Sequence, residues 1–273
     1  MGLTGLEHLT LLGVSPPDFV TTAAEAGFTA VGLRISPATD GERPWPVAPG
    51  SPMLAETVRR RADTGLTVLD VEAVRLGPPA AGTDRTPAYG PVLEAAAALG
   101  ARYVNAICDD PDLSRLSDSF TALVAAAAPY GIRPVVEFMA YRSVATLREA
   151  VAIAARSGGG GILVDALHVQ RCGVRLADLA DLRAADPGLI TYVQLCDAPL
   201  RAPADPQREA RAGRLLPGAG ELPLLDLLDA LPDDVAVAVE APSEAPAGMP
   251  AEFAARARRA LDSVLSQAKE RRS

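Results

Sequence analysis

The sequence is poor in the residues that form disulfide bonds and histidine-rich metal sites. It holds three widely separated cysteines and two histidines among its 273 residues. An odd number of scattered cysteines gives neither a disulfide framework nor zinc-finger spacing, which is typical of a reducing compartment. Two histidines are too few for a poly-histidine zinc cluster.

An excess of basic charge is also missing. The net charge is −8 and the isoelectric point is about 4.9. This acidic net charge argues against nucleic acid as a partner. It does not exclude a local basic pocket for an anionic substrate. The first residues show no basic segment followed by an apolar one, and no apolar run reaches membrane-spanning length. We therefore expect a cytoplasmic protein without membrane or nucleic-acid partners.

Aromatic residues make up only 4% of the chain, whereas 49% of it is hydrophobic and dominated by small aliphatic residues. Such residues suit strands that are buried on both faces and helices that pack closely against them. The length is large for a generic domain but ordinary for one α/β barrel.

Short aliphatic runs alternate with Ala-rich amphipathic stretches, which is typical of repeated βαβ units. Eight runs are expected to form strands: His8–Val14, Phe28–Ile35, Leu66–Leu76, Ala101–Cys108, Ile132–Phe138, Gly161–Leu167, Leu189–Leu195 and Val235–Val239. Glycines 27, 65, 100 and 131 each follow a helical stretch, and Ser51-Pro52 reads as a helix start.

Eight such units predict an α/β fold with a single (β/α)8 TIM-barrel domain over residues 1–273, with a frayed tail at 269–273. A doubly wound open sheet is the rival fold. It usually carries GxGxxG after the first strand, but here the expected first strand ends in Gly13-Val-Ser-Pro-Pro17.

Two connections are unusually long, and both follow expected strands. They are Ser36–Gly50, which contains Trp45, and Asp197–Leu222, which is rich in arginine and proline. Both should lie on the top face, where barrels keep their active sites. Trp45 is a candidate apolar wall for a substrate, with ordinary loop packing as an equal alternative.

Four successive expected strands place a polar side chain at the end of an apolar run: Glu137, Asp165, Gln194 and Glu240. Converging buried carboxylates would repel one another, and a divalent cation resolves that conflict. Oxygen ligands favour Mg²⁺ or Mn²⁺, with Co²⁺ tolerated. Each residue taken alone could instead anchor a loop, cap a helix or bond a neighbouring strand.

Two further residues are candidates for binding a substrate. His168 lies three residues after Asp165 and is expected to hydrogen-bond substrate, with a packed core histidine as the alternative. Arg214 precedes a rigid Leu-Leu-Pro-Gly turn that could aim one guanidinium inward, whereas most arginines of this connection should be solvated.

These motifs resemble the sugar phosphate isomerase/epimerase superfamily with a xylose-isomerase-like barrel. The segments that carry the resemblance are Pro134-Val-Val-Glu137, Val164-Asp-Ala-Leu-His168, Tyr192-Val-Gln-Leu-Cys-Asp197, Arg214-Leu-Leu-Pro-Gly-Ala-Gly-Glu221 and Val237-Ala-Val-Glu240. The resemblance implies that Glu137, Asp165, Gln194 and Glu240 bind the metal and that the two glutamates form the acid/base pair. It also implies that His168 and Arg214 contact substrate.

Gln194 stands where many members carry histidine, and this is similar to the hydroxypyruvate isomerase branch. The chain departs from that branch by about a dozen inserted residues before the Pro-Gly turn. Endonuclease relatives need more histidines and a basic surface, and neither is present here.

The resemblance implies an isomerase or epimerase that works on a small carbohydrate-like molecule by proton transfer through a metal-stabilised enediolate. A dehydratase or lyase of the inosose, dehydroshikimate or C-glycosyl type could use the same residues. A non-catalytic sugar-binding barrel is the third hypothesis. No basic phosphate cup is evident in the sequence, and a homo-oligomer remains open.

Overall fold

The strands close into the barrel that the alternation predicted. The computed structural model describes residues 2–39, 41–78, 89–243 and 249–272. Eight parallel strands pair in sequence order, with β1 against β8. They are β1 (Thr4–Glu7), β2 (Ala30–Arg34), β3 (Thr67–Leu76), β4 (Tyr103–Cys108), β5 (Arg133–Glu137), β6 (Gly161–Asp165), β7 (Ile190–Leu195) and β8 (Ala236–Val239).

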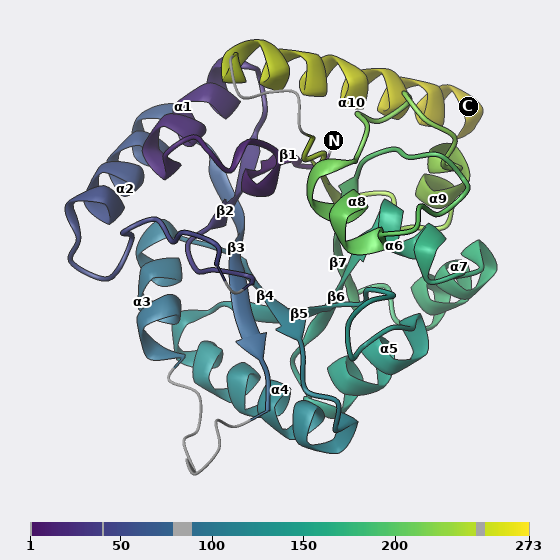
Figure 1. The fold of residues 1–273 in the computed structure, drawn as a ribbon, viewed down its shortest axis with the longest axis horizontal. Coiled ribbons are helices and arrows are strands. Elements are labelled where there is room, and N and C mark those ends of the chain that lie inside the picture. Colours follow the sequence, from purple (N-terminus) through teal and green to yellow (C-terminus); the bar gives the residue numbers. More distant parts are fainter. Residues whose placement is uncertain (1, 40, 79–88, 244–248, 273) are drawn as a thin grey trace.

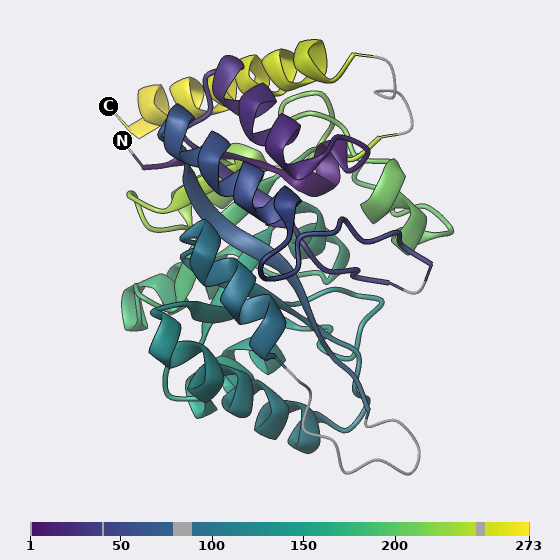
Figure 2. The same cartoon turned by 90° about the vertical axis from the view of Figure 1, so that its left-hand side faces the viewer.

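The helices surround this barrel on the outside (Figures 1 and 2). The α-helices are α1 (Pro16–Glu25), α2 (Pro52–Thr64), α3 (Gly90–Leu99), α4 (Leu113–Ala127), α5 (Leu147–Arg156), α6 (Ala166–Arg171), α7 (Leu176–Ala185), α8 (Pro206–Ala212), α9 (Leu224–Asp229) and α10 (Pro250–Arg272). Two 3-10 helices, η1 (His8–Leu11) and η2 (Ala128–Tyr130), complete the elements. No helix among the described residues is both long and apolar enough to cross a membrane.

The expected helix ends are confirmed. Ser51 caps α2 by accepting the Leu54 N–H, and Pro52 is its first residue. Gly65 and Gly100 follow α2 and α3 in the left-handed conformation, which a residue without Cβ adopts freely.

The first strand was predicted wrongly, because it lies before the apolar run that suggested it. Residues 4–7 form β1, and His8–Leu11 form η1. His8 is not part of the strand pairing of the sheet. Its ring stacks on Phe19, and its Nε2 lies 2.8 Å from the Val14 carbonyl oxygen. The apolar run therefore packs as a turn against α1. The other seven strands lie within two residues of their predicted ranges.

The chain end also differs from the frayed tail that was expected. Helix α10 continues to Arg272, and Ser273 lies outside the described residues. Arg271 binds Asp226 at 2.6 Å, and Arg272 binds Asp229 at 2.9 Å. These ion pairs with α9 tether the last turn to the barrel.

Alternation along the strands decides which side chains enter the barrel. A small separate cluster of Ala30, Leu69, Val135, Leu163, Tyr192 and Ala238 fills its lower interior. The next inward positions on β5, β6 and β7 are polar, because successive inward residues lie two apart. The sheet therefore has an apolar floor with a polar layer above it.

A buried carboxyl pair, Glu7 and Asp70, forms part of this polar layer. Both side chains converge over Gly32, where an added Cβ would lie 1.6 Å from Glu7 Oε2 and 2.3 Å from Asp70 Oδ1. The Tyr192 hydroxyl donates to Asp70 Oδ2 at 2.9 Å from the opposite side of the barrel. Burial, followed by repulsion from Glu72, raises the pKa of Asp70 to about 8. Burial and Asp70 also raise the pKa of Glu7 well above its usual range. The pair therefore keeps a proton at neutral pH.

We predict that Gly32→Ala destabilises the fold by about 1–3 kcal/mol, because its methyl group would overlap the two buried carboxyls. Gly13→Ala is the matched control, since an added Cβ there meets nothing within 4 Å. It should change the free energy of unfolding by less than about 0.5 kcal/mol. Urea unfolding of both variants measures the difference, and equal stabilities would contradict the close approach.

We also predict that Asp70 makes a contribution to stability that falls as pH rises from about 4 towards 8, because the folded state retains the Asp70 proton that the unfolded chain has released. Asp70→Asn carries no such titration. It should flatten this profile and be more stable than the parent at pH 8.5 by at least about 1 kcal/mol. Urea unfolding across pH measures this, with the exposed Asp181→Asn as control. A stability difference between Asp70→Asn and the parent that does not grow as pH rises over this window would refute the raised pKa of Asp70.

Candidate functional site

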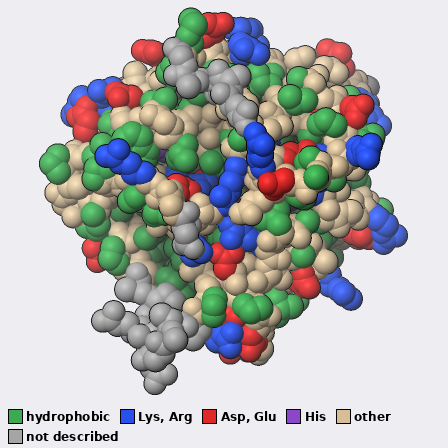
Figure 3. Space-filling view, in the orientation of Figure 1, with side chains coloured by type: hydrophobic (Ala, Val, Ile, Leu, Met, Phe, Trp, Pro, Cys, Tyr) green, Lys and Arg blue, Asp and Glu red, His purple; other side chains and the backbone are tan. Residues whose placement is uncertain are grey.

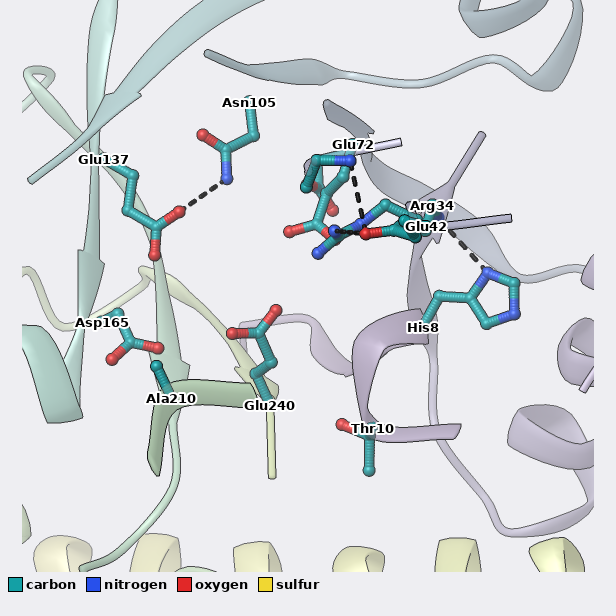
Figure 4. A network of polar contacts seen from close by, with 12 residues as sticks. His8, Thr10, Arg34, Glu42, Glu72, Asn105, Glu137, Asp165, Ala210 and Glu240 are labelled. Carbon is teal, nitrogen blue, oxygen red and sulfur yellow. Dashed lines mark hydrogen bonds and ion pairs between the residues drawn. The ribbon is translucent and has the colours of Figure 1, made fainter. Parts of the chain in front are cut away.

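The four strand-end residues predicted from the sequence all lie in the polar layer of the barrel. Glu137 ends β5, Asp165 ends β6, Gln194 is the fifth residue of β7, and Glu240 follows β8. All four side chains are buried. Ladder pairing places Asp165 beside Gln194, and the Glu240 N–H donates to the Leu195 carbonyl at 3.0 Å. Figure 4 shows the carboxylates of Glu137, Asp165 and Glu240 pointing toward a common space.

A cavity of about 250 Å³ opens onto this layer. Glu137, His168, Arg214 and Glu240 line it from the barrel side. The two long connections supply other walls, with residues Thr39 and Glu42 after β2 and Ala210 and Arg211 from α8. The expectation that both connections border the site is therefore confirmed.

Arg214 holds two of the carboxylates together. Its Nη1 lies 2.5 Å from Asp165 Oδ2, and its Nη2 lies 3.1 Å from Glu240 Oε2. Nε donates to the Ala210 carbonyl at 2.8 Å, which orients the guanidinium. Burial alone would raise the pKa of Asp165, but the Arg214 charge outweighs it and leaves that pKa below its usual range. Asp165 is therefore ionised at neutral pH.

Glu137 and Glu240 behave differently from Asp165. Burial, and then repulsion from Asp165, raises the pKa of Glu137 to about 8, although the Asn105 amide donates to Glu137 Oε2 at 2.8 Å. Burial also raises the pKa of Glu240 well above its usual range, in spite of the opposing charge of Arg214. One guanidinium does not neutralise three buried carboxyls, so the cluster would accept a further positive charge.

His168 was expected to contact substrate, and the structure places it directly beside the carboxylates. Its Nε2 is 3.6 Å from Glu137 Oε1, and its backbone N–H is capped by Asp165 Oδ1 at 3.0 Å. Burial lowers the pKa of His168 to about 4, so the imidazole is neutral. Ligand atoms of Glu137, Asp165 and His168 lie within 4.8 Å of one another, which is close enough to hold one metal ion.

Gln194 carries a buried amide whose hydrogen-bonding groups are unsatisfied. Its side-chain oxygen and nitrogen are both buried and find no hydrogen-bond partner among the described residues. An unpaired buried amide is costly, and such groups in native proteins normally have a partner. The donors present, namely carboxylates, a neutral imidazole and an amide oxygen, fit a divalent metal ion.

Trp45 is not among the described residues that line the cavity. Its indole N–H donates to the Leu12 carbonyl at 3.2 Å, and its ring packs against the main core. The structure thus places Trp45 in the loop packing that was the alternative to substrate binding.

Sequence reasoning missed the polar residues of the first four strands. Arg34 ends β2 and pairs with Glu72 of β3 at 2.8 Å and with Glu42 at 3.4 Å. Asn105 of β4 holds Glu137. The signal lay in the Gly32-x-Arg34 and Asp70-x-Glu72 alternations of residues on one face of a strand. Their polar residues lie inside the strand ranges predicted from the sequence and not at the ends of those ranges. Glu7, Asp70 and Glu72 form a second group close enough for a metal ion, although Glu72 is already paired with Arg34.

Solved structures with similar folds cover nearly the whole chain. A xylose isomerase-like TIM barrel/4-hydroxyphenylpyruvate dioxygenase fusion protein matches 99% of this chain with a TM-score of 0.79 and 19% identity. The match spans only 44% of the fusion protein. The IOLI protein, described with a binding zinc atom, is 17% identical with a TM-score of 0.76, covering 97% of this chain and 98% of that one. D-psicose 3-epimerase, solved in the presence of D-fructose, is 16% identical with a TM-score of 0.68, covering 95% and 97%.

No curated protein matches the sequence. The family model described as xylose isomerase-like TIM barrel matches residues 20–264, which is most of the chain and includes the residues of the site. On that match, the chain belongs to the xylose isomerase-like TIM barrel family.

Proposed function

We propose that this protein is a divalent-metal-dependent isomerase or epimerase of a small sugar or hydroxy-ketone. The observation that carries the proposal is the pair of buried glutamates, Glu137 and Glu240, which face one cavity from β5 and β8. Because these strands are separated around the barrel, the two carboxyls reach a bound molecule from different sides. This is the arrangement that removal and return of a proton require.

The electrostatics of the two glutamates support this role. The pKa of Glu137 is about 8, which is closer to neutral pH than that of an ordinary carboxyl, and burial raises the pKa of Glu240 well above its usual range. A carboxylate with a raised pKa is a stronger base, and proton exchange is most efficient when the catalytic pKa lies near the working pH. Asp165 stays ionised beside Arg214 and so provides constant negative charge.

We propose Glu137, Asp165, Gln194 and Glu240 as the metal ligands, with His168 near enough to replace one of them. A bound divalent ion would polarise the substrate carbonyl and stabilise negative charge on its oxygen. Mn²⁺ and Mg²⁺ suit the carboxylates best, and Co²⁺ also suits a site that contains an imidazole. The unpartnered Gln194 amide supports this assignment.

The other residues of the site bind and orient the substrate in this proposal. His168 is neutral, so it can donate one hydrogen bond to a substrate hydroxyl. Arg214 holds Asp165 and Glu240 in place and keeps its charge at any accessible pH. The family membership and the similarity to a named epimerase agree with this reaction class. The hydroxypyruvate isomerase branch remains a prediction that rests on Gln194, on the Gln-x-x-Asp-x-Pro motif that it begins and on the Pro-Gly-x-Gly-Glu turn after it.

Proton transfer is tested by solvent exchange. Incubated in D₂O with Mn²⁺, the protein should incorporate deuterium at the carbon next to the carbonyl of a trial ketose, as mass spectrometry or NMR measures. Glu240→Gln should slow this exchange by about 10²-fold or more, because an amide cannot take up the proton. Exposed Glu25→Gln is the control and should exchange at the parent rate. Full exchange in Glu240→Gln would refute the assignment. A new ultraviolet-absorbing enone product would instead identify the dehydratase reaction at the same residues.

Metal binding is tested by inductively coupled plasma mass spectrometry of the purified protein. We expect about one divalent ion per chain and its loss in Glu137→Ala/Glu240→Ala. Gln194→Met and His168→Asn distinguish the ligand sets: the first should weaken metal binding about 10-fold or more, and the second should change it less. The reverse order would assign the histidine in place of Gln194. Absence of metal in the parent protein after reloading with Mn²⁺ would contradict the site.

A further inference from the structure

We propose that the substrate carries an acidic group, a carboxylate or a phosphate, and that Arg211 of α8 binds it. The inference rests on the proposed function for the reacting end of the molecule, but binding of the anion can be measured separately. D-psicose 3-epimerase, a protein of similar fold, was solved in the presence of D-fructose, a sugar that has no charge. An acidic substrate would therefore set this chain apart.

Charge pairing within the cavity singles out Arg211. Four arginines line the cavity, and three of them have carboxylate partners. Arg34 pairs with Glu72, Arg214 pairs with Asp165 and Glu240, and Arg142 pairs with Asp109. Arg211 has no hydrogen bond or ion pair within the part of the chain that the structure describes. It is thus an unpaired guanidinium on the wall of a small cavity.

The surroundings of Arg211 favour an anion next to it. Burial lowers the pKa of Arg211 below its usual value; Tyr141 and Glu42 oppose this shift, and the charges of Arg142 and Arg34 add to it. A bound anion would relieve that unfavourable placement. Glu42 also lines the cavity, but its Oε2 already accepts from Arg34 Nη1 and the Ala38 N–H, each at 3.4 Å.

A second hydrogen-bond donor, Arg142, lines the same cavity as Arg211. Arg142 Nε is buried and has no hydrogen-bond partner among the described residues, although the same side chain pairs with Asp109 through Nη1. The Arg142 guanidinium lies 5.8 Å from the centre of the Tyr141 ring, which also lines the cavity. Arg211 and Arg142 together offer N–H donors to one acidic group. Figure 3 shows Lys and Arg side chains gathered around the centre of this face.

Helix α8 holds Arg211 firmly at this position. Glu209 is buried and accepts two hydrogen bonds from Arg171, at 2.7 and 2.8 Å. Gly213 bridges to Ser243 just after the helix, and Arg214 then enters the barrel. Because α8 lies in the segment inserted before the Pro-Gly turn, this chain's own insertion supplies the anion-binding residue.

The size of the cavity limits the substrate. A volume of about 250 Å³ is small for a ligand pocket, which commonly measures about 300–1,000 Å³. A short hydroxy-keto acid or a small ketose phosphate fits this space, with its carbonyl end at the glutamates and its acidic end at Arg211. A neutral analogue would leave the guanidinium unpaired and should bind less well.

Isothermal titration of the full chain with D-glycerate and with inorganic phosphate tests the proposal without any turnover. We expect at least one probe to bind, and Arg211→Gln to weaken it about 10- to 100-fold, as for loss of a charged hydrogen bond. Exposed Arg201→Gln removes the same charge elsewhere and should bind as the parent does. The probe that binds more tightly identifies the carboxylate or the phosphate as the recognised group.

Unchanged binding in Arg211→Gln, or no binding of either probe to the parent protein, would overturn the proposal. Thermal melting of Arg211→Gln checks that the variant is folded, and Arg211→Lys should restore part of the affinity because it restores the charge. Anion binding without deuterium exchange in any ketose would refute the proposed function alone. Exchange without Arg211-dependent binding would refute this inference alone.

Discussion

The bridge from Arg214 to Asp165 and Glu240 is the interaction on which the site depends. A closed barrel buries the strand ends of β5, β6 and β8 beside one another, so their carboxyls lie within one polar layer. Burying such groups without compensation is strongly unfavourable. The guanidinium keeps Asp165 ionised but leaves Glu137 and Glu240 with raised pKa values. The same incomplete compensation makes the site receptive to a cation and its glutamates suited to proton transfer.

The barrel handles its negative charge in two different ways. On one side, Arg34 and Arg214 compensate carboxylates at the cavity. Deeper in the barrel, Glu7 and Asp70 form no ion pair with any described basic side chain and retain a proton instead. Gly32 permits this pair, because any side chain there would occupy the same space. An apolar floor topped by Tyr192 separates the polar layer from the bottom of the barrel.

The segment around α8, between β7 and the Pro-Gly turn, supplies the residue that we propose selects an acidic substrate. Helix α8 and the residues after it supply both Arg214, which organises the carboxylates, and Arg211, which has no ion-pair partner among the described residues. These two residues are three apart, yet one points to the reacting groups and the other lines the outer wall. A single anchored insertion can therefore set both the electrostatics of the site and the kind of molecule that enters it. The rigid anchor is the Arg171–Glu209 pair.

Much of the site could be predicted from strand ends because parallel strands in a barrel bring those ends to one face. Glu137, Asp165, Gln194 and Glu240 followed clear apolar runs, so their meeting in the barrel was foreseeable. Arg34, Glu72 and Asn105 were missed because they lie inside the ranges predicted for the second, third and fourth strands and not at the ends of those ranges. The strand prediction that failed, His8–Val14, mistook an apolar turn packed on α1 for β1 and so concealed Glu7.

The sequence by itself determined the alternation of strands and helices, the glycine helix ends and the identity of the strand-end carboxylates. These follow from local periodicity and from backbone conformations that few residues adopt. Only the tertiary structure decided which charges meet. It placed Trp45 in loop packing, brought His168 toward Glu137 and left Arg211 without a carboxylate partner in the part of the chain that is described. Pairing between side chains far apart in the chain depends on barrel register and loop path, and neither is written in local sequence.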